Sequence, residues 1–388
     1  MSISDNPLLQ KLIEQADKQG GVIPYHQFMR IALYDPEHGY YMRPAPRLGP
    51  EGDFVTAPEI TSLFGELLTL QFIEVWQRLG MPESFKVVEV GAGSGKLAVD
   101  LLKTAQKFAP FAAALDYAIL EKSLDFRKLQ RESLAEAQIE PQRCRWIEDD
   151  DALIAEGPMR GVLYGNEILD AFPVHWMEKQ QQQWREIGAR WDGACWQEEG
   201  LLDGQQACID YLQRFEPLPD GFRTEVCLDA QRWVKRMAEN ISAGVMLFID
   251  YGYTAKDYYQ PGLPQGTLMA HYKHKRIMDP WLHPGEMDLT AHVDFSAMAQ
   301  QGRQAGLETY GYTSQGWFLM GLGILQRLEQ VMARSGDEQL IRQLKQSVAR
   351  LVMPDAMGER FKVLAMGRGL RGAEPLAGFS QNNKLDRL

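Results

Sequence analysis

Glycines at alternate positions form the part of the sequence best suited to bind a ligand. The segment VVEVGAGSGKL, residues 87–97, joins an apolar run to the start of a helical pattern. Because Gly91, Gly93 and Gly95 have no Cβ, the backbone can turn sharply there and a ligand can approach it closely. The free N–H groups at the start of the helix then face a negatively charged or polar ligand group. The sequence predicts a ligand site at this turn, with a tight turn that binds nothing as the alternative.

Three ligand classes use such a turn, and the spacing separates them. A phosphate-binding loop needs Gly-x-x-x-x-Gly-Lys followed by Ser or Thr, but Val90 stands five places before Gly95 and Leu97 follows the lysine. A dinucleotide turn needs a third glycine where Lys96 stands. The remaining pattern is Gly-x-Gly-x-Gly with Glu89 two places before it. It resembles the first motif of Rossmann-like S-adenosyl-L-methionine (SAM) methyltransferases.

Acidic residues follow the next two predicted strands. Glu121 stands at the end of the second strand, where a carboxylate can accept both hydroxyls of a ribose. A solvated side chain beside Lys122 is the alternative. Asp149 and Asp150 follow the third strand and are candidates to accept the adenine amino group, with a solvated helix N-cap as the alternative.

An alternation of apolar runs and helical stretches positions these residues. The expected strands are 86–90, 117–120, 145–147, 162–164 and 245–249. Helices are expected at 96–108, at 124–137 with Phe126, Leu129 and Leu134 on its apolar face, and at 230–240. This order predicts an α/β fold with a parallel sheet covered by helices on both faces.

A small β-meander interrupts this alternation after the fourth strand. The runs 174–177, 184–187 and 194–196 turn at a glutamine run and at Asp192-Gly193. The expected segments are a helical and loop-rich cap (1–80), the first part of the SAM-binding domain (81–172) and the insertion (173–228). They are followed by the second part of the domain with substrate-cap insertions (229–370) and a flexible tail (371–388).

Composition excludes several classes of protein. The chain of 388 residues has 41 Lys and Arg against 52 Asp and Glu, a net charge of -11, which argues against a dedicated nucleic-acid or anionic-membrane binder. No uninterrupted apolar stretch approaches 18 residues, so no membrane insertion is expected. Four scattered cysteines and a start without a basic region predict reduced thiols and a cytoplasmic location. Four histidines within 271–292 lack ligand spacing, so no metal site is predicted.

Several segments besides the glycine turn resemble the MidA family of SAM-dependent methyltransferases. The resemblance runs from about residue 20 to residue 370. The segments that carry it are YDPEHGYY (34–41), GDFVTAPE (52–59), FGE (64–66), GNEILDAFPV (165–174), DYG (250–252), GTL (266–268) and DLTAHVDF (288–295).

The resemblance implies a Rossmann-like seven-strand sheet with SAM as methyl donor and a helical, loop-rich N-terminal cap. Mitochondrial members of the family assist assembly of respiratory complex I by dimethylating an arginine of one of its subunits. For this chain the resemblance implies a protein substrate, with a complex I-type subunit as one candidate. A homodimer is one option for the oligomeric state.

Polar residues that follow the fourth and fifth strands are candidates for the transfer itself. An arginine guanidinium stays charged at neutral pH, so flanking carboxylates are expected to orient it. Glu167, Asp250 and Asn166 are the catalytic candidates, and Asp170 and Tyr251 are the candidates for substrate contact. Helix capping, solvation or, for the tyrosine, simple packing are the alternatives.

The segment 53–59 is expected to fold over the donor site. Within it, Thr56 is a candidate donor contact and Glu59 a candidate substrate contact. Two other functions stay open: a SAM-binding assembly chaperone with incidental or no methylation, and a small-molecule methyltransferase. Glu167→Gln separates the chaperone from the enzyme, and a closed pocket in place of a broad acidic groove would favour a small substrate.

Overall fold

Two compact units make up the chain, and the glycine turn belongs to the second. The computed structural model describes residues 6–42, 57–273 and 275–388. The first unit comprises the described parts of Met1–Arg47, Leu169–Trp233 and Tyr253–Asp294. The second comprises those of Leu48–Ile168, Val234–Gly252 and Phe295–Leu388.

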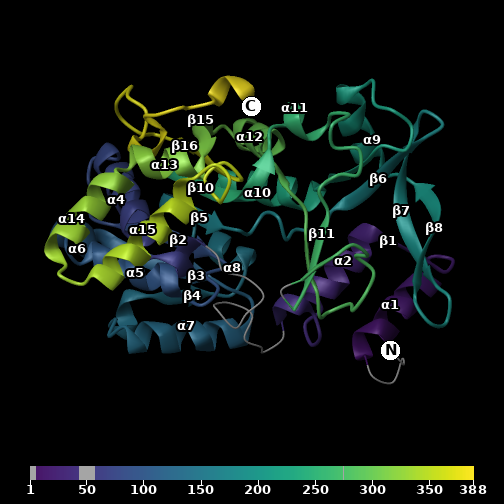
Figure 1. Ribbon diagram of the computed structural model, residues 1–388, viewed down its shortest axis with the longest axis horizontal. Coiled ribbons are helices and arrows are strands. Elements are labelled where there is room, and N and C mark those ends of the chain that lie inside the picture. The colour runs from purple at the N-terminus through teal and green to yellow at the C-terminus, as the bar shows by residue number, and fades with distance from the viewer. Residues whose placement is uncertain (1–5, 43–56, 274) are drawn as a thin grey trace. The chain divides into compact units, whose positions relative to one another are not determined.

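A mixed sheet forms the centre of the second unit (Figure 1). Its strand order is β15-β16-β10-β5-β2-β3-β4. The bounds are β2 (Phe85–Val90), β3 (Leu115–Leu120), β4 (Arg145–Ile147), β5 (Met159–Asn166), β10 (Ile241–Tyr253), β15 (Glu308–Ser314) and β16 (Phe361–Arg368). The five strands from β10 to β4 are parallel, whereas β16 runs antiparallel to both of its neighbours. The predicted α/β fold with a parallel sheet is confirmed; in the described residues a two-residue strand, β14 (Val293–Asp294), lies off the seven-strand path.

Helices enclose the apolar core of the second unit. They are α3 (Ala57–Ile60), α4 (Ser62–Arg78), α5 (Lys96–Ala105), α6 (Ala109–Ala114), α7 (Leu124–Glu136), α8 (Asp150–Ala155), α12 (Phe295–Gln304), α13 (Gln315–Gly321), α14 (Ile324–Arg334) and α15 (Glu338–Val352). The buried side chains of α4 and α5 join those of the sheet and of α13 in one cluster, for example Phe72, Leu101, Val162 and Phe318. Short apolar strands become buried because helices from both sides remove them from water.

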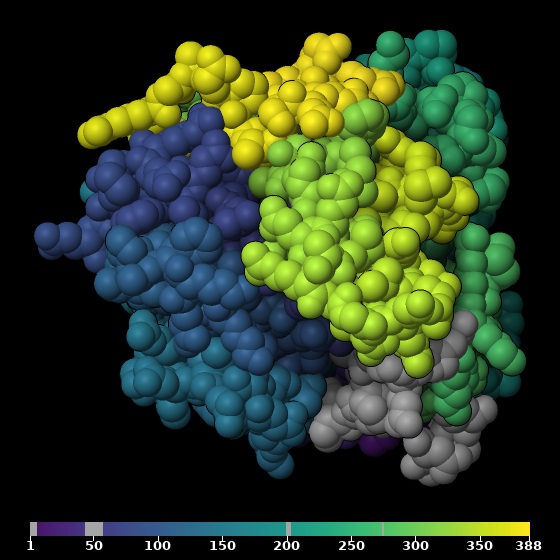
Figure 2. All heavy atoms as spheres, turned by 60° about the vertical axis from the view of Figure 1, so that its left-hand side comes forward, coloured from purple at the N-terminus to yellow at the C-terminus, as the bar shows by residue number. Residues whose placement is uncertain are grey.

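Part of the C-terminal segment 371–388, which the sequence predicts as a flexible tail, is packed: Leu376, Gly378 and Phe379 are buried. The Phe379 ring is 1% exposed and lies edge-on to Phe318, with ring centroids 5.3 Å apart. The Gly378 N–H donates to Gln71 Oε1 of α4 at 2.9 Å. Figure 2 shows the C-terminal residues in yellow along the top of the view, beside the dark blue of α4. Leu376 is 2% exposed and joins the same core cluster, and the Tyr312 N–H donates to Asn383 Oδ1 at 3.0 Å. Two buried apolar side chains and hydrogen bonds thus dock a stretch that composition marks as polar.

The predicted insertion forms the sheet of the first unit, with strand order β1-β7-β6-β9 and β8 paired to β7. β6 and β7 overlap the predicted runs 174–177 and 184–187, whereas β8 begins at Trp196, where the predicted run 194–196 ends. β1 was not expected, because three residues are too few to show alternation. The bounds are β1 (Val22–Pro24), β6 (His175–Gln180), β7 (Gln183–Trp191), β8 (Trp196–Asp203) and β9 (Arg223–Val226). Helices α1 (Pro7–Asp17) and α2 (Tyr25–Tyr34) share a buried cluster with this sheet.

The remaining elements of the first unit follow the insertion. A three-stranded sheet, β12-β11-β13, is built from β11 (Met269–Tyr272), β12 (Lys275–Ile277) and β13 (Asp288–Thr290). The helices are α9 (Gln206–Leu212) and α11 (Ala255–Tyr258), and α10 (Leu228–Asn240) continues into the second unit. The units therefore group residues 62–78 with the SAM-type sheet, whereas the predicted cap extends to residue 80. Across the described ranges, every helix is too short or too polar to cross a membrane.

Candidate functional site

The carboxyl ends of five parallel strands meet at one edge of the second unit's sheet. Val90, the last residue of β2, lies opposite Leu120 of β3 and Gly165 of β5. Asn166 at the end of β5 lies opposite Ile249 of β10. Ligands of open α/β sheets bind outside such an edge. The predicted residues that share it are Gly91, Gly93, Gly95, Glu121, Asp149, Asp150, Asn166, Glu167, Asp250 and Tyr251.

The glycine turn has the backbone that its sequence predicts. Gly91, Gly93 and Gly95 have φ of 64°, 52° and 81°, a left-handed region in which side chains are costly. A Cβ at position 91 would lie 3.2 Å from Ile168 Cγ2. Gly95 is the N-cap of α5 and has no side chain to cap the first N–H groups. The turn therefore presents backbone donors at the edge of the sheet.

Glu59 lies beside this turn. The Ser94 hydroxyl donates to Glu59 Oε1 at 2.5 Å, and Ser94 Oγ accepts from the Lys96 N–H at 3.3 Å. The short helix α3 is thereby joined to the glycine turn. Thr56, the predicted donor contact, lies outside the described residues.

Glu121 stands at the end of β3 and is held from two sides. Its Oε1 accepts from the Ser123 N–H at 2.9 Å, and its Oε2 accepts from Gln130 Nε2 at 3.2 Å. Burial raises the pKa of the Glu121 carboxyl, and these two hydrogen bonds oppose the rise. The paired geometry leaves the carboxylate fixed in orientation, as a bidentate contact to two hydroxyls requires.

Helix capping, the alternative left open by the sequence, accounts in part for the acidic residues Asp149 and Asp150 at this position. Asp149 is the N-cap of α8, and its Oδ1 accepts from the Ala152 N–H at 2.8 Å. Asp150 lies in the first turn of that helix, 3.9 Å from the Lys122 ammonium. Their contact with an adenine stays a prediction.

Glu89 points into the sheet's core and is 3% exposed. The Tyr117 hydroxyl donates to its carboxyl, and Tyr164 lies 2.8 Å from that hydroxyl. Burial raises the pKa of Glu89 to about 7, although the bonds from both tyrosines lower it. The contacts that the structure describes for Glu89 are thus with tyrosines of the neighbouring strands β3 and β5. Its contact with the donor stays a prediction.

Asn166 and Glu167 give the edge its least ordinary geometry. Glu167 has φ of 55°, which a non-glycine residue adopts at a cost of roughly 1–3 kcal/mol. Asn166 Nδ2 donates to Glu167 Oε1 at 3.1 Å. Asn166 Oδ1 is buried and has no hydrogen-bond partner among the residues that the structure describes. A strained backbone at an acidic residue, next to a buried acceptor that has no partner, is typical of a functional site.

Asp250 holds the loop that carries these two residues. It is 1% exposed, and its carboxylate accepts from the Ile168 N–H at 3.1 Å and the Tyr251 N–H at 2.9 Å. The Glu167 N–H donates to the carbonyl of Ile249, also on β10, at 2.8 Å. These bonds fix the strained backbone from the neighbouring strand. Tyr251 packs edge-on against Phe361, which favours the packing alternative for its ring without testing a substrate contact.

Asp170 lies in the first unit. It is 4% exposed, and its backbone carbonyl accepts from the Ala291 N–H at 3.0 Å. Its predicted contact with a substrate stays a prediction.

Gln130 and Ser94 belong to the site although the sequence did not single them out. Gln130 contacts both the glycine turn and Glu121. The available signal was a glutamine four places before Leu134 on the face of α7 that meets the sheet. The apolar periodicity instead predicted that Leu129 would lie on the buried face, but Leu129 is 39% exposed.

The arrangement fits a sulfonium nucleoside. The left-handed glycines admit the amino-acid part, the Glu121 carboxylate suits ribose hydroxyls, and unpartnered Asn166 Oδ1 can accept from an ammonium or amide group.

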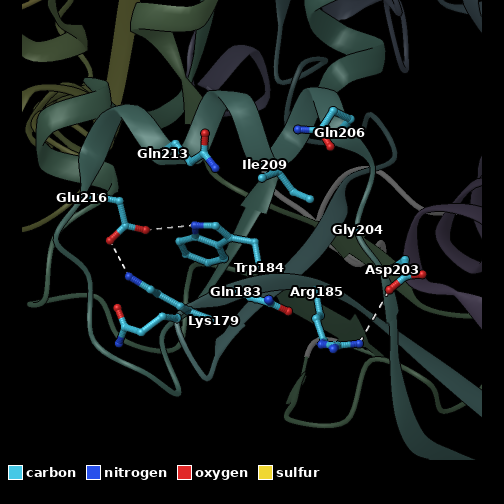
Figure 3. Close-up of a pocket in the computed structure, with 11 residues that line it drawn as sticks. Lys179, Gln183, Trp184, Arg185, Asp203, Gly204, Gln206, Ile209, Gln213 and Glu216 are labelled. Carbon is cyan, nitrogen blue, oxygen red and sulfur yellow. Dashed lines mark hydrogen bonds and ion pairs between the residues drawn. The ribbon is translucent and has the colours of Figure 1, made fainter.

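A cavity of about 600 Å³ lies in the first unit, between α9 and the hairpin of β6 and β7 (Figure 3). Glu216 accepts from the Trp184 indole N–H at 3.1 Å and pairs with Lys179. Arg185 lies 3.7 Å from Asp203. The charged groups of the cavity thus neutralise one another, and none of the predicted site residues lines it.

Comparison with known proteins supports the chemistry of the edge. Residues 67–313 match the model of a family described as an S-adenosyl-L-methionine-dependent methyltransferase. The chain is 34% identical to a COG1565 superfamily protein of Burkholderia thailandensis crystallised with S-adenosyl-homocysteine (SAH). The TM-score is 0.90, and the match covers 98% of this chain and 96% of the other.

Curated relatives match over nearly the whole chain. The protein arginine methyltransferase NDUFAF7 homolog of Drosophila melanogaster is 33% identical over 93% of this chain and 86% of its own length. The NDUFAF7 protein of Xenopus tropicalis is 31% identical over 98% and 91%. Both are mitochondrial proteins, and this contradicts the predicted cytoplasmic location, which rested only on cysteine usage and the first residues. The matches confirm the family resemblance: the chain belongs to this family of S-adenosyl-L-methionine-dependent methyltransferases.

Proposed function

We propose that the chain transfers a methyl group from SAM to an arginine side chain of a protein substrate. The observation that carries the proposal is the pair at the end of β5, where Asn166 Oδ1 is buried without a partner beside the strained Glu167. Relatives over nearly the whole length are named protein arginine methyltransferases, which supports the choice of acceptor.

The glycine turn and the strand ends hold the donor. Gly91, Gly93 and Gly95 admit its methionine part, and Glu121 accepts the ribose hydroxyls. Asp149 and Asp150 are the proposed contacts to the adenine, and Thr56 a further contact. Bound SAM supplies a methyl group on a positively charged sulfur. The protein adds position and a water-poor environment.

Glu167 faces the acceptor. Its carboxylate orients the guanidinium and receives the proton that the attacking nitrogen loses. The new N–C bond would form as the bond between sulfur and the methyl group breaks, with SAH as the leaving group. Asn166 keeps that carboxylate in place through the bond to Oε1, and Asp250 holds the backbone that follows Glu167 through the Ile168 N–H. Asp170, Tyr251 and Glu59 are proposed to contact the flanking substrate residues.

The acceptor protein is proposed to be a subunit of a complex I-type respiratory enzyme, as the family resemblance implies. A homodimer is proposed as the working assembly. Mass spectrometry of labelled bands from a lysate lacking this protein identifies the acceptor, and light scattering of the purified chain gives its assembly.

Glu167→Gln tests the transfer step. The change keeps the shape of the side chain and removes its charge, so methyl incorporation from labelled SAM should fall at least about 100-fold while SAH affinity changes less than about threefold. The exposed Glu338→Gln serves as the matched control. Undiminished methylation by Glu167→Gln would refute the role of Glu167. Full biological rescue by a variant that cannot methylate would instead favour an assembly chaperone.

A further inference from the structure

Helix α7 buries a polar face, which is unusual for a helix that covers a Rossmann-like sheet. Its buried residues are Arg127, Gln130 and Leu134, spaced three and four apart. Gln130 is 0% exposed. Taking a carboxamide out of water is unfavourable unless each of its polar atoms finds a partner, so its contacts show what the burial achieves.

Three segments of the strand-end edge meet at this one carboxamide. Gln130 Nε2 donates to the Gly93 carbonyl at 3.1 Å and to Glu121 Oε2 at 3.2 Å. Gln130 Oε1 accepts from the Trp146 indole N–H at 2.9 Å. The glycine turn after β2, the acid after β3 and the strand β4 are thus joined through one side chain.

The partners leave the carboxamide a single orientation. An indole N–H can only donate, and a carbonyl or carboxylate oxygen can only accept. A flipped amide would set its NH₂ against Trp146 and its oxygen against Gly93 and Glu121. The backbone adds a second constraint, because a Cβ at Gly95 would lie 3.2 Å from Gln130 Cα. Gln130 therefore lies against the glycine turn with its amide locked.

We propose that Gln130 is a positioning residue that fixes the Glu121 carboxylate and the Gly93 carbonyl in the geometry that binds the donor's ribose. It acts through these two groups and does not itself touch the acceptor. The inference rests on the proposed function, since it assumes that Glu121 accepts ribose hydroxyls.

The charges around Glu121 agree with this role. Burial raises the pKa of the Glu121 carboxyl, and the hydrogen bonds from Ser123 and Gln130 and the charge of Arg127 lower it. The Glu89 carboxyl also interacts with it, through charge repulsion. Losing the Gln130 donor would therefore disfavour the ionised carboxylate, the form that accepts two hydroxyls.

The test compares two ligands by calorimetry: SAH and its 2′-deoxy analogue. The wild type should bind SAH at least about tenfold more tightly, because a hydroxyl bound to a charged carboxylate is worth about that much. Gln130→Met keeps the length of the side chain and removes its donors. Its SAH affinity should fall about tenfold or more, and its preference for SAH over the deoxy analogue should shrink to less than about threefold.

A purely structural role predicts a different pattern. Gln130→Met would then lose thermal stability but keep the wild-type preference, and that result would overturn the proposal. Lys128→Met, on the exposed face of α7, controls for the effect of a methionine in this helix. Should Gln130→Met not fold, Trp146→Phe frees the amide to flip, and the same loss of preference is expected at smaller size.

Gln130→Glu supplies a readout in pH. Its carboxyl donates to Glu121 only when protonated, so SAH binding by the variant should strengthen from pH 8 to pH 6, whereas the wild type should not strengthen. Parallel pH profiles would contradict the proposal. If the wild type binds neither ligand, the proposed function fails; if it binds SAH with an unchanged preference in Gln130→Met, only the role of Gln130 fails.

Discussion

Two regions of the molecule contain a buried polar group, the Lys179 ammonium in one and Asn166 Oδ1 in the other, and they differ in how this group is satisfied. In the cavity of the first unit, Glu216 accepts from Trp184, from the Leu218 N–H and from Lys179. At the strand ends of the second unit, Asn166 Oδ1 is buried with no partner in the described part of the chain, beside Glu167 at φ 55°.

This difference indicates that the cavity's polar groups contribute to stability, whereas those at the strand ends contribute to function. Polar groups that satisfy one another cost little and need no ligand. An unsatisfied acceptor beside a strained backbone persists only where the surrounding structure imposes it. Here β10 imposes it, because Asp250 accepts from the Ile168 N–H and the Ile249 carbonyl accepts from the Glu167 N–H. The strand ends are therefore where a ligand gains most by binding.

The largest effect is expected from a glycine pair that contrasts the two regions. Gly93→Val, at φ 52°, places a branched side chain at the donor turn, and SAH affinity should fall more than about 100-fold by calorimetry. Gly193→Val is the matched control in the inserted sheet: its φ is 101°, and a Cβ there meets no atom within 4 Å. It should lose stability but bind SAH normally. If both variants bound SAH with equal affinity, the proposed position of the donor at the glycine turn would be wrong.

A smaller effect is expected in the cavity. Lys179→Met leaves Glu216 without its charged partner, and the Lys179 side chain is only 3% exposed. The free energy of unfolding in urea should fall by about 1–3 kcal/mol, with SAH affinity unchanged within about twofold. A tenfold loss of SAH affinity would mean that the cavity contributes to the donor site.

The last expected effect concerns pH. Glu89 has a folded-state pKa of about 7, raised by burial, so the folded state binds its proton more tightly than the unfolded state. Its contribution to stability therefore declines as pH rises from about 4.5 to about 7 and is level above that, and the whole decline is at most about 3 kcal/mol. Glu89→Gln should flatten this slope in urea unfolding measured from pH 4.5 to pH 8. An unchanged slope would assign it to other groups.

The sequence predicts the parts of the site that depend on the backbone. Gly91, Gly93 and Gly95 are needed for their φ, and Glu121 follows its strand directly, so spacing alone locates them at one edge. The parallel sheet likewise follows from the β-α-β alternation, whereas the order of its strands does not.

Side-chain networks could not be predicted in this way. The buried face of α7 contains Arg127 and Gln130, because hydrogen bonds to the strand ends outweigh the apolar pattern of Phe126 and Leu129. The packing of the C-terminal residues was missed because only Leu376 and Phe379 bury apolar side chains in an otherwise polar segment. In both cases the deciding contacts come from residues distant in sequence.

A crystal structure of the chain with SAH measures the central claim most directly. The account predicts both ribose hydroxyls about 3 Å from the Glu121 carboxylate, the homocysteine part along the glycine turn, and a donor of the ligand at Asn166 Oδ1. SAH bound away from the strand ends, or a nicotinamide compound bound there in its place, would contradict it.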